Sequence, residues 1–144
     1  MALKEAPMSE TSLTFMLMDP PFESTRSTTA LRLLQIAADR GYDLKVLAYE
    51  GAVYLPFAGQ AGHPNPIHGH TVSEEDHPLP KDWIASIRDT AAANGGSLDW
   101  VNCGMCADER GANDAIDGVR RGGPPALATW LDETTNTLII PTRG

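Results

Sequence analysis

The chain of 144 residues has only two cysteines, and its basic side chains are few. Lysine and arginine together number 11 against 19 aspartates and glutamates, which gives a net charge of -8. A field of this sign repels phosphate backbones and anionic lipids, so we expect no nucleic-acid partner. No apolar run approaches the roughly 20 residues that span a bilayer, and the first residues lack the basic start and apolar centre of a signal peptide. These absences predict a cytoplasmic protein without a membrane partner.

Sequence motifs for nucleotide chemistry are also absent. The chain contains no G-x-G-x-x-G, no Walker sequence and no serine nucleophile elbow, so we expect neither nucleotide-dependent chemistry nor a cofactor. A hydrophobic share of 42% and a charged share of 21% are ordinary for one compact domain. We therefore expect a single domain over residues 1–144, with a disordered lead at residues 1–11.

Short apolar or β-rich runs alternate along the chain with segments in which apolar residues recur every three or four positions. The predicted strands cover residues 13–18, 43–49, 98–102 and 137–141. The predicted helices cover residues 27–40, 51–57, 83–94, 107–115 and 126–133. This order predicts an α/β fold with a mainly parallel sheet of four or five strands and helices on both faces.

Residues 60–80 lack any periodicity and hold all four histidines of the chain, His63, His68, His70 and His77. Carboxylates accompany them, so imidazole and carboxylate ligands suited to zinc or nickel are present. The spacing matches no recognised metal motif, however, and ordering a flexible loop costs entropy before a metal can bind. We therefore predict a solvated insertion loop and no metal site, and these histidines are the candidate ligands if that prediction fails.

The two cysteines form a Cys-x-x-Cys motif directly after the third predicted strand. Ligands of parallel α/β sheets bind at the carboxyl ends of strands, where Cys103 stands, and a helix N-terminus stabilises a thiolate. Gly104 removes side-chain bulk beside the sulfur. A structural zinc would need four ligands, and no second such motif exists. Burial as a small hydrophobic residue is the alternative for either cysteine, but the spacing favours a chemical role.

Charged residues near this edge of the sheet are further candidates. Asp19 follows the first strand, so we expect it to form a wall of the same pocket. At the start of the helix after the cysteines, Arg110 would favour a thiolate, whereas Asp108 and Glu109 would oppose it. The simpler interpretation of all three is exposed helix-start charge. We interpret the later pair of adjacent arginines, at residues 120–121, as a solvated helix end.

The motifs of this chain and their order resemble those of the DsrE/DsrF-like family, which includes DsrE, TusD and YchN. The resemblance covers most of residues 13–142, through the segments LTFMLMDPP, STTALRLLQIAADRG, DLKVLAY, NCGMCADERG and ATWLDETTNTLII. In the DsrE and TusD branch, a cysteine after the third strand carries sulfur, and the glycine of an Arg-Gly pair follows eight residues later. Cys103 stands eight residues before Gly111, which Arg110 precedes. The resemblance therefore implies that Cys103 is the sulfur-bearing residue.

The resemblance implies a three-layer flavodoxin-like or YchN-like fold, assembly into trimers or hexamers, and a cysteine persulfide passed between sulfur-donor and sulfur-acceptor proteins. It thus predicts a sulfur carrier or sulfurtransferase. Two features depart from the family pattern: the long segment at residues 62–80, and Cys106, which the one-cysteine carriers lack.

The position of the two cysteines predicts different roles for them. Cys103, before the helix, is expected to be the more exposed and more reactive, and Cys106, inside the first turn, to act as a shielded resolving thiol. Two other functions stay open. One is a thiol-disulfide oxidoreductase that cycles a Cys103–Cys106 disulfide, and the other is a non-enzymatic interaction or metal-binding protein.

Overall fold

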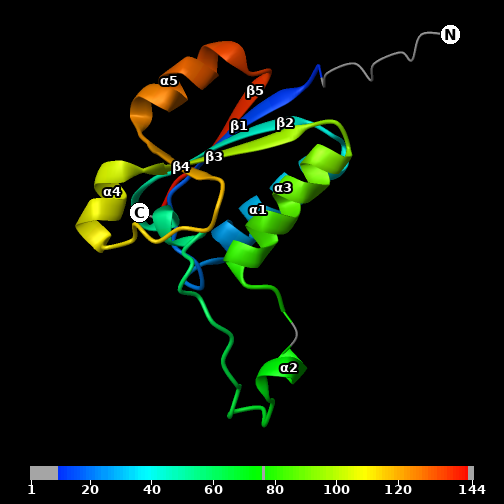
Figure 1. Ribbon diagram of the computed structural model, residues 1–144, viewed down its shortest axis with the longest axis vertical. Helices are drawn as coiled ribbons and strands as arrows, with labels where there is room; N and C mark the ends of the chain where they lie inside the picture. The colour runs from blue at the N-terminus through cyan, green and yellow to red at the C-terminus, as the bar shows by residue number, and fades with distance from the viewer. Residues whose placement is uncertain (1–9, 76, 143–144) are drawn as a thin grey trace, which may run out of the picture.

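The computed structural model describes residues 10–75 and 77–142 (Figure 1). The strands in this part of the chain are β1 (Ser12–Leu17), β2 (Asp43–Ala48), β3 (Ser97–Cys103), β4 (Val119–Gly122) and β5 (Asn136–Ile140). The helices are α1 (Thr25–Asp39), α2 (Val72–Glu75), α3 (Pro80–Ala93), α4 (Gly104–Arg110) and α5 (Pro124–Glu133), with a 3-10 helix, η1 (Glu50–Tyr54). Except for its last two residues, the lead predicted at residues 1–11 falls outside the described residues.

The strands form one parallel sheet in the order β4-β3-β2-β1-β5. All carboxyl ends consequently lie at the same edge. Gly41 turns the chain from α1 into β2, since its φ of 72° is a left-handed conformation that glycine adopts without a Cβ clash. The predicted α/β fold with a parallel sheet is confirmed.

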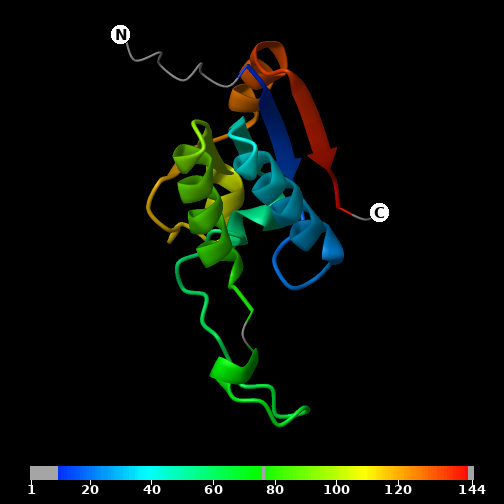
Figure 2. The same cartoon turned by 90° about the vertical axis from the view of Figure 1, so that its right-hand side faces the viewer.

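Helices cover both faces of the sheet (Figures 1 and 2). On one face, α1 and α3 pack against each other and bury the main core, which includes Leu34, Val46 and Trp100. On the other face, Trp130 of α5 packs on Met16, Leu47 and Val101. Burial of these large apolar side chains supplies the main free energy of folding, roughly 1.5–3 kcal/mol for each. The expected three-layer arrangement is therefore present.

The structure corrects two sequence predictions near the cysteines. The helix after them begins at Gly104 and ends at Arg110, rather than covering residues 107–115. Arg120 and Arg121 do not end a helix: they lie in β4, which pairs with β3. Each arginine contacts an aspartate, Arg120 with Asp99 and Arg121 with Asp108. The sequence pattern of this short polar segment did not indicate an edge strand.

The segment between η1 and α3 extends away from the sheet as an arm (Figures 1 and 2). We define the arm as residues 61–75. Its side chains are largely exposed, and it contains a backbone bridge between Asn65 and His70 and the one-turn helix α2. The arm lies within the segment 60–80 and is less irregular than the sequence predicts.

Candidate functional site

The cysteine pair lies at the carboxyl edge of the sheet, as predicted. Cys103 is the last residue of β3 and the N-cap of α4, and Cys106 lies in the first turn of that helix. Cys103 Sγ accepts a hydrogen bond from the backbone N–H of Cys106 at 3.5 Å and lies 2.8 Å from Cys106 Sγ. Because a disulfide bond is about 2.05 Å long, a small side-chain rotation would bring the sulfurs to bonding distance.

Both cysteines are buried, which corrects the expectation that Cys103 is the more exposed. Each is 4% exposed. They form a cluster with Val53 of η1 and two alanines of the α4 region, and Tyr49 and Tyr54 pack against it. The cause is η1, which follows β2 and covers the end of neighbouring β3. Of the motif CGMC, only Met105 is exposed, at 74%.

The protonation of Cys106 depends on this burial. Burial, followed by the hydrogen bond to Cys103, raises the pKa of the Cys106 thiol to about 11. The backbone N–H of Glu50 has the opposite effect, because it stabilises negative charge on this sulfur. Cys106 is therefore a thiol at neutral pH and donates its proton toward Cys103 Sγ. This arrangement places hydrogen-bond donors around Cys103, where a thiolate would need them.

The guanidinium of Arg121 lies directly beside Gly104. A Cβ at this position would lie 2.6 Å from Nε of Arg121, so that guanidinium occupies the space the glycine leaves. Arg121 also donates to Asp108 at 2.5 and 2.9 Å and to Asn113 at 3.1 Å. The hydrogen bonds that the Asp108 carboxylate accepts from Arg121 and from Asn113 Nδ2 lower the pKa of Asp108 to about 2. Helix α4 is thus attached to β4, and the Asp108 side chain, which stays exposed as predicted, is paired with Arg121.

Arg110 joins α4 to η1. Its guanidinium donates to Glu50 Oε2 at 2.5 Å and to the carbonyl of Cys106 at 3.3 Å. The Tyr54 hydroxyl donates to the Arg110 carbonyl at 2.5 Å. Gly111 then ends α4 in a left-handed conformation, with φ 64°, as a helix C-cap glycine does. Arg110 is therefore held beside the cysteines by contacts from two residues of η1.

Glu50 and Tyr54 are the site residues that sequence reasoning missed. Both lie in η1, directly after β2, whose neighbour in the sheet is β3. The sequence did contain a signal for Glu50, because residues that follow adjacent parallel strands meet at one edge of the sheet. The sequence Glu50-Gly51 after a predicted strand therefore marked Glu50 as a candidate.

Asp19 lies at the same edge but has a local role. Its carboxylate accepts a hydrogen bond from Ser24 Oγ at 2.6 Å, and its carbonyl accepts one from Ser27 Oγ at 3.1 Å. These contacts fix the turn from β1 into α1, where Ser24 is the N-cap. An adjoining cavity of about 520 Å³ is lined by its neighbours Met18 and Pro20 together with Glu23, Glu50, Gly51, Tyr54, Arg110 and Thr142.

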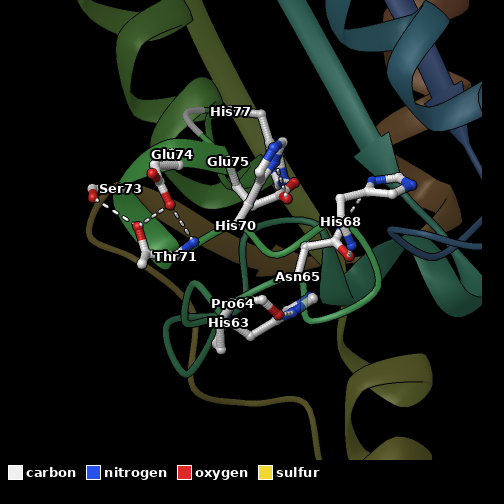
Figure 3. Close-up of polar contacts among 10 residues, drawn as sticks. All are labelled: His63, Pro64, Asn65, His68, His70, Thr71, Ser73, Glu74, Glu75 and His77. Atoms are coloured by element: carbon white, nitrogen blue, oxygen red, sulfur yellow. Dashed lines mark hydrogen bonds and ion pairs between the residues drawn. The ribbon is translucent and has the colours of Figure 1, made fainter.

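The four histidines lie in or next to the arm (Figure 3). His70 Nδ1 is 3.1 Å from Glu75 Oε1, and His77 Nε2 is 3.9 Å from the other oxygen of that carboxylate. His63 contacts the carbonyl of Pro64, and His68 contacts Asn65. Within residues 10–75 and 77–142, no three His, Cys, Asp or Glu side chains are arranged to hold a metal ion.

A model of the DsrE/DsrF-like family matches residues 11–139. The chain belongs to this family. No curated protein matches it. Among solved structures, the crystal structure of the ychN protein from E. coli superposes with a TM-score of 0.69 at 20% identity, over 90% of this chain and 99% of that one. A conserved protein of unknown function from Bacteroides thetaiotaomicron gives a TM-score of 0.54 at 12% identity, over 94% and 99%. At these identities the two structures support the fold.

No helix in the described part of the chain is long and apolar enough to cross a membrane.

Proposed function

We propose that this protein is a sulfur-relay protein that carries sulfane sulfur as a persulfide on Cys103. The observation that carries the proposal is the position of Cys103 Sγ at the end of β3, where it receives donors from both the backbone and the side chain of Cys106. Two donors stabilise the thiolate that must attack sulfur. Membership of a family associated with sulfur relay supports the same assignment.

Loading is a thiol exchange on a donor persulfide, R–S–SH. The Cys103 thiolate attacks the outer sulfur, a new S–S bond forms, the donor S–S bond breaks, and the donor leaves as R–S⁻. Cys103 then carries S–SH. An acceptor thiolate removes the outer sulfur by the same exchange and returns Cys103 to its thiolate form.

Cys106 provides a second outcome. After losing its proton to water, its thiolate attacks the Cys103 sulfur, the Cys103–Cys106 disulfide forms, and the carried sulfur leaves as HS⁻. An external thiol must then reduce the disulfide before the next cycle. The sulfur separation of 2.8 Å favours this attack.

The same separation supports a second candidate function, a thiol-disulfide oxidoreductase. In that reaction Cys103 attacks a substrate disulfide, one thiolate leaves, and Cys106 releases the other as the internal disulfide forms. The substrate disulfide is reduced and the cysteine pair is oxidised.

Partners and assembly form the next part of the proposal. We infer that the sulfur donor and acceptor are proteins, that the protein works in the reducing cytoplasm, and that it assembles as a homotrimer or homohexamer. Half-exposed apolar side chains support assembly: Leu33, Ile36 and Leu138 line a groove of about 310 Å³ between α1 and β5. Because β5 is an edge strand, a second subunit would also protect its unpaired backbone.

Mass spectrometry after incubation with a persulfide donor tests the function. We expect the wild type to gain the mass of one or two sulfur atoms, and Cys103→Ser to gain none. An oxidoreductase would lose the mass of two hydrogens without first gaining sulfur, and it would reduce a test disulfide. A protein that does neither, and whose cellular role survives Cys103→Ser, is a non-enzymatic interaction protein, and the proposal is then wrong.

A further inference from the structure

Asn102 is a buried polar residue directly before Cys103, and the proposed chemistry does not use it. Its side-chain amide makes two hydrogen bonds. Oδ1 accepts from Trp100 Nε1 at 3.0 Å, and Nδ2 donates to the carbonyl of Val53 at 3.1 Å. An indole N–H can only donate, which fixes the amide with its oxygen toward Trp100 and its NH2 group toward Val53. Asn102 therefore joins β3 to η1.

The sequence of η1 explains why the Val53 carbonyl needs this donor. In a 3-10 helix, each carbonyl accepts a hydrogen bond from the N–H three residues later. Three residues after Val53 stands Pro56, which has no N–H. Both residues are fully buried, and a buried carbonyl without a partner is destabilising. The amide of Asn102 supplies the donor that the proline lacks.

η1 covers the two sulfurs at the residue that Asn102 binds. Val53 packs with Cys103 and Cys106 in one buried cluster. Each cysteine is only 4% exposed, so a movement of η1 away from β3 would uncover both sulfurs. The hydrogen bond from Asn102 to Val53 opposes that movement directly.

Two further contacts attach η1 to α4. Glu50 forms an ion pair with Arg110, and the Tyr54 hydroxyl donates to the Arg110 carbonyl. The side chains of the ion pair are 43% and 29% exposed, so water and salt weaken it. Asn102 and Val53 are buried, and water does not compete for the bond between them. This bond is therefore the stronger restraint on the part of η1 that touches the cysteines.

We propose that Asn102 is a positioning residue for the cysteine pair: its bond to the Val53 carbonyl holds η1 over both sulfurs and keeps small reagents away from them. This geometric role is independent of the reaction. A second consequence rests on the proposed function, because a persulfide on Cys103 would then be protected from small thiols. Such a thiolate attacks the outer sulfur, R–S–SH forms, and the S–S bond to Cys103 breaks as Cys103 leaves as its thiolate.

Asn102→Leu tests the proposal, because leucine has nearly the same shape but no donor. The Val53 carbonyl is then unpaired, and η1 should open more often. Thr14→Val is the matched control. Thr14 is also buried in the sheet, and its hydroxyl lies 2.8 Å from that of Thr134. It stands in the amino-terminal half of β1, whereas η1 lies at the carboxyl edge of the sheet.

The experiment follows alkylation of Cys103 and Cys106 by iodoacetamide at pH 8, with peptide mapping. We expect Asn102→Leu to be alkylated at least roughly fivefold faster than the wild type, which corresponds to about 1 kcal/mol lost from the closed state. The control should stay within about twofold of the wild type. Opening of η1 exposes little surface, so low concentrations of urea should change the rate only weakly, whereas global unfolding would make it rise steeply.

An unchanged rate in Asn102→Leu, an equal rise in Thr14→Val, or a steep urea dependence of the faster rate would overturn the proposal. Circular dichroism checks that each variant is folded. Asn102→Ala, which also lacks the donor, replaces Asn102→Leu if that variant does not fold, with the same expected increase in rate.

A second measurement uses the protein loaded with sulfur. Asn102→Leu should lose the sulfur on Cys103 to glutathione several-fold faster than the wild type, once the loss without thiol is subtracted. Equal losses would refute the protection of the persulfide. Failure of Cys103 to load sulfur would refute the proposed function alone, because the alkylation rates do not depend on it.

Discussion

Cys106 donates to Cys103 Sγ through its backbone N–H, and its own sulfur lies 2.8 Å from that acceptor. The two cysteines are equally buried, so exposure does not distinguish them. The direction of the hydrogen bonds distinguishes the two cysteines, because Cys103 accepts both bonds and Cys106 donates both. This difference leads to the following prediction about their roles.

Cys106→Ala should leave sulfur loading possible but slower, since Cys103 Sγ loses one of its two donors. It should slow the release of sulfide by at least roughly tenfold, since no internal thiol can then displace the carried sulfur. Cys103 should also be alkylated first at neutral pH in the wild type. Peptide mapping after limited alkylation, together with sulfide release followed over time, measures both. Earlier labelling of Cys106, with loss of loading in Cys106→Ala alone, would show that the roles are reversed.

The raised pKa of Cys106 predicts a loss of stability in alkaline solution. The folded pKa of about 11 lies above the ordinary 9.0, so the unfolded chain loses this proton first as pH rises. Stability linked to Cys106 is therefore complete below pH 9 and is lost between pH 9 and 11. Thermal unfolding in the presence of a reductant should show a steeper fall in Tm over this interval for the wild type than for Cys106→Ala. Equal slopes would contradict the buried-thiol argument.

The sequence patterns predicted the position of Cys103, because both a strand end and a helix start are local features. Apolar runs marked β1 to β3, and glycine at residue 41 marked the end of α1. The signal for α2 was present but unused: Thr71 and Glu74 form part of a capping box, in which the Glu74 carboxylate accepts from the Thr71 N–H at 2.7 Å.

The remaining features depend on contacts between distant segments. β4 pairs with β3, and Arg120 within it donates to Asp99, 21 residues earlier. Burial of Cys103 depends on η1, about 50 residues earlier in the chain. No periodicity in a single sequence encodes such contacts. The exposure of Cys103 was therefore predicted wrongly, although its position at the strand end was predicted correctly.

The turn after α1 provides a stability test with a matched control. Gly41 has φ 72°, and a Cβ there would lie 2.1 Å from the carbonyl oxygen of Asn94, at the end of α3. Gly95 has φ 85° but open space around it. Gly95→Ala should therefore cost only the left-handed penalty of about 1 kcal/mol, whereas Gly41→Ala should cost roughly 2–4 kcal/mol because α1 or α3 must also move. Urea unfolding measures both, and equal costs would contradict the close approach.

The histidines provide the last prediction, because they separate a solvated arm from a metal site. His68 and His70 are exposed, their rings lie 6.0 Å apart between centroids, and His70 contacts Glu75 rather than the cysteine edge (Figure 3). Replacing both by alanine should leave persulfide loading of Cys103 within about twofold of wild type and Tm within a few degrees, since surface changes of this kind alter stability by about 0.5 kcal/mol or less. Loading measured by mass spectrometry and metal content measured on the purified protein decide the matter together. Stoichiometric zinc or nickel that disappears on this double substitution would make the arm a metal site, and a loss of loading would connect the arm to the sulfur chemistry.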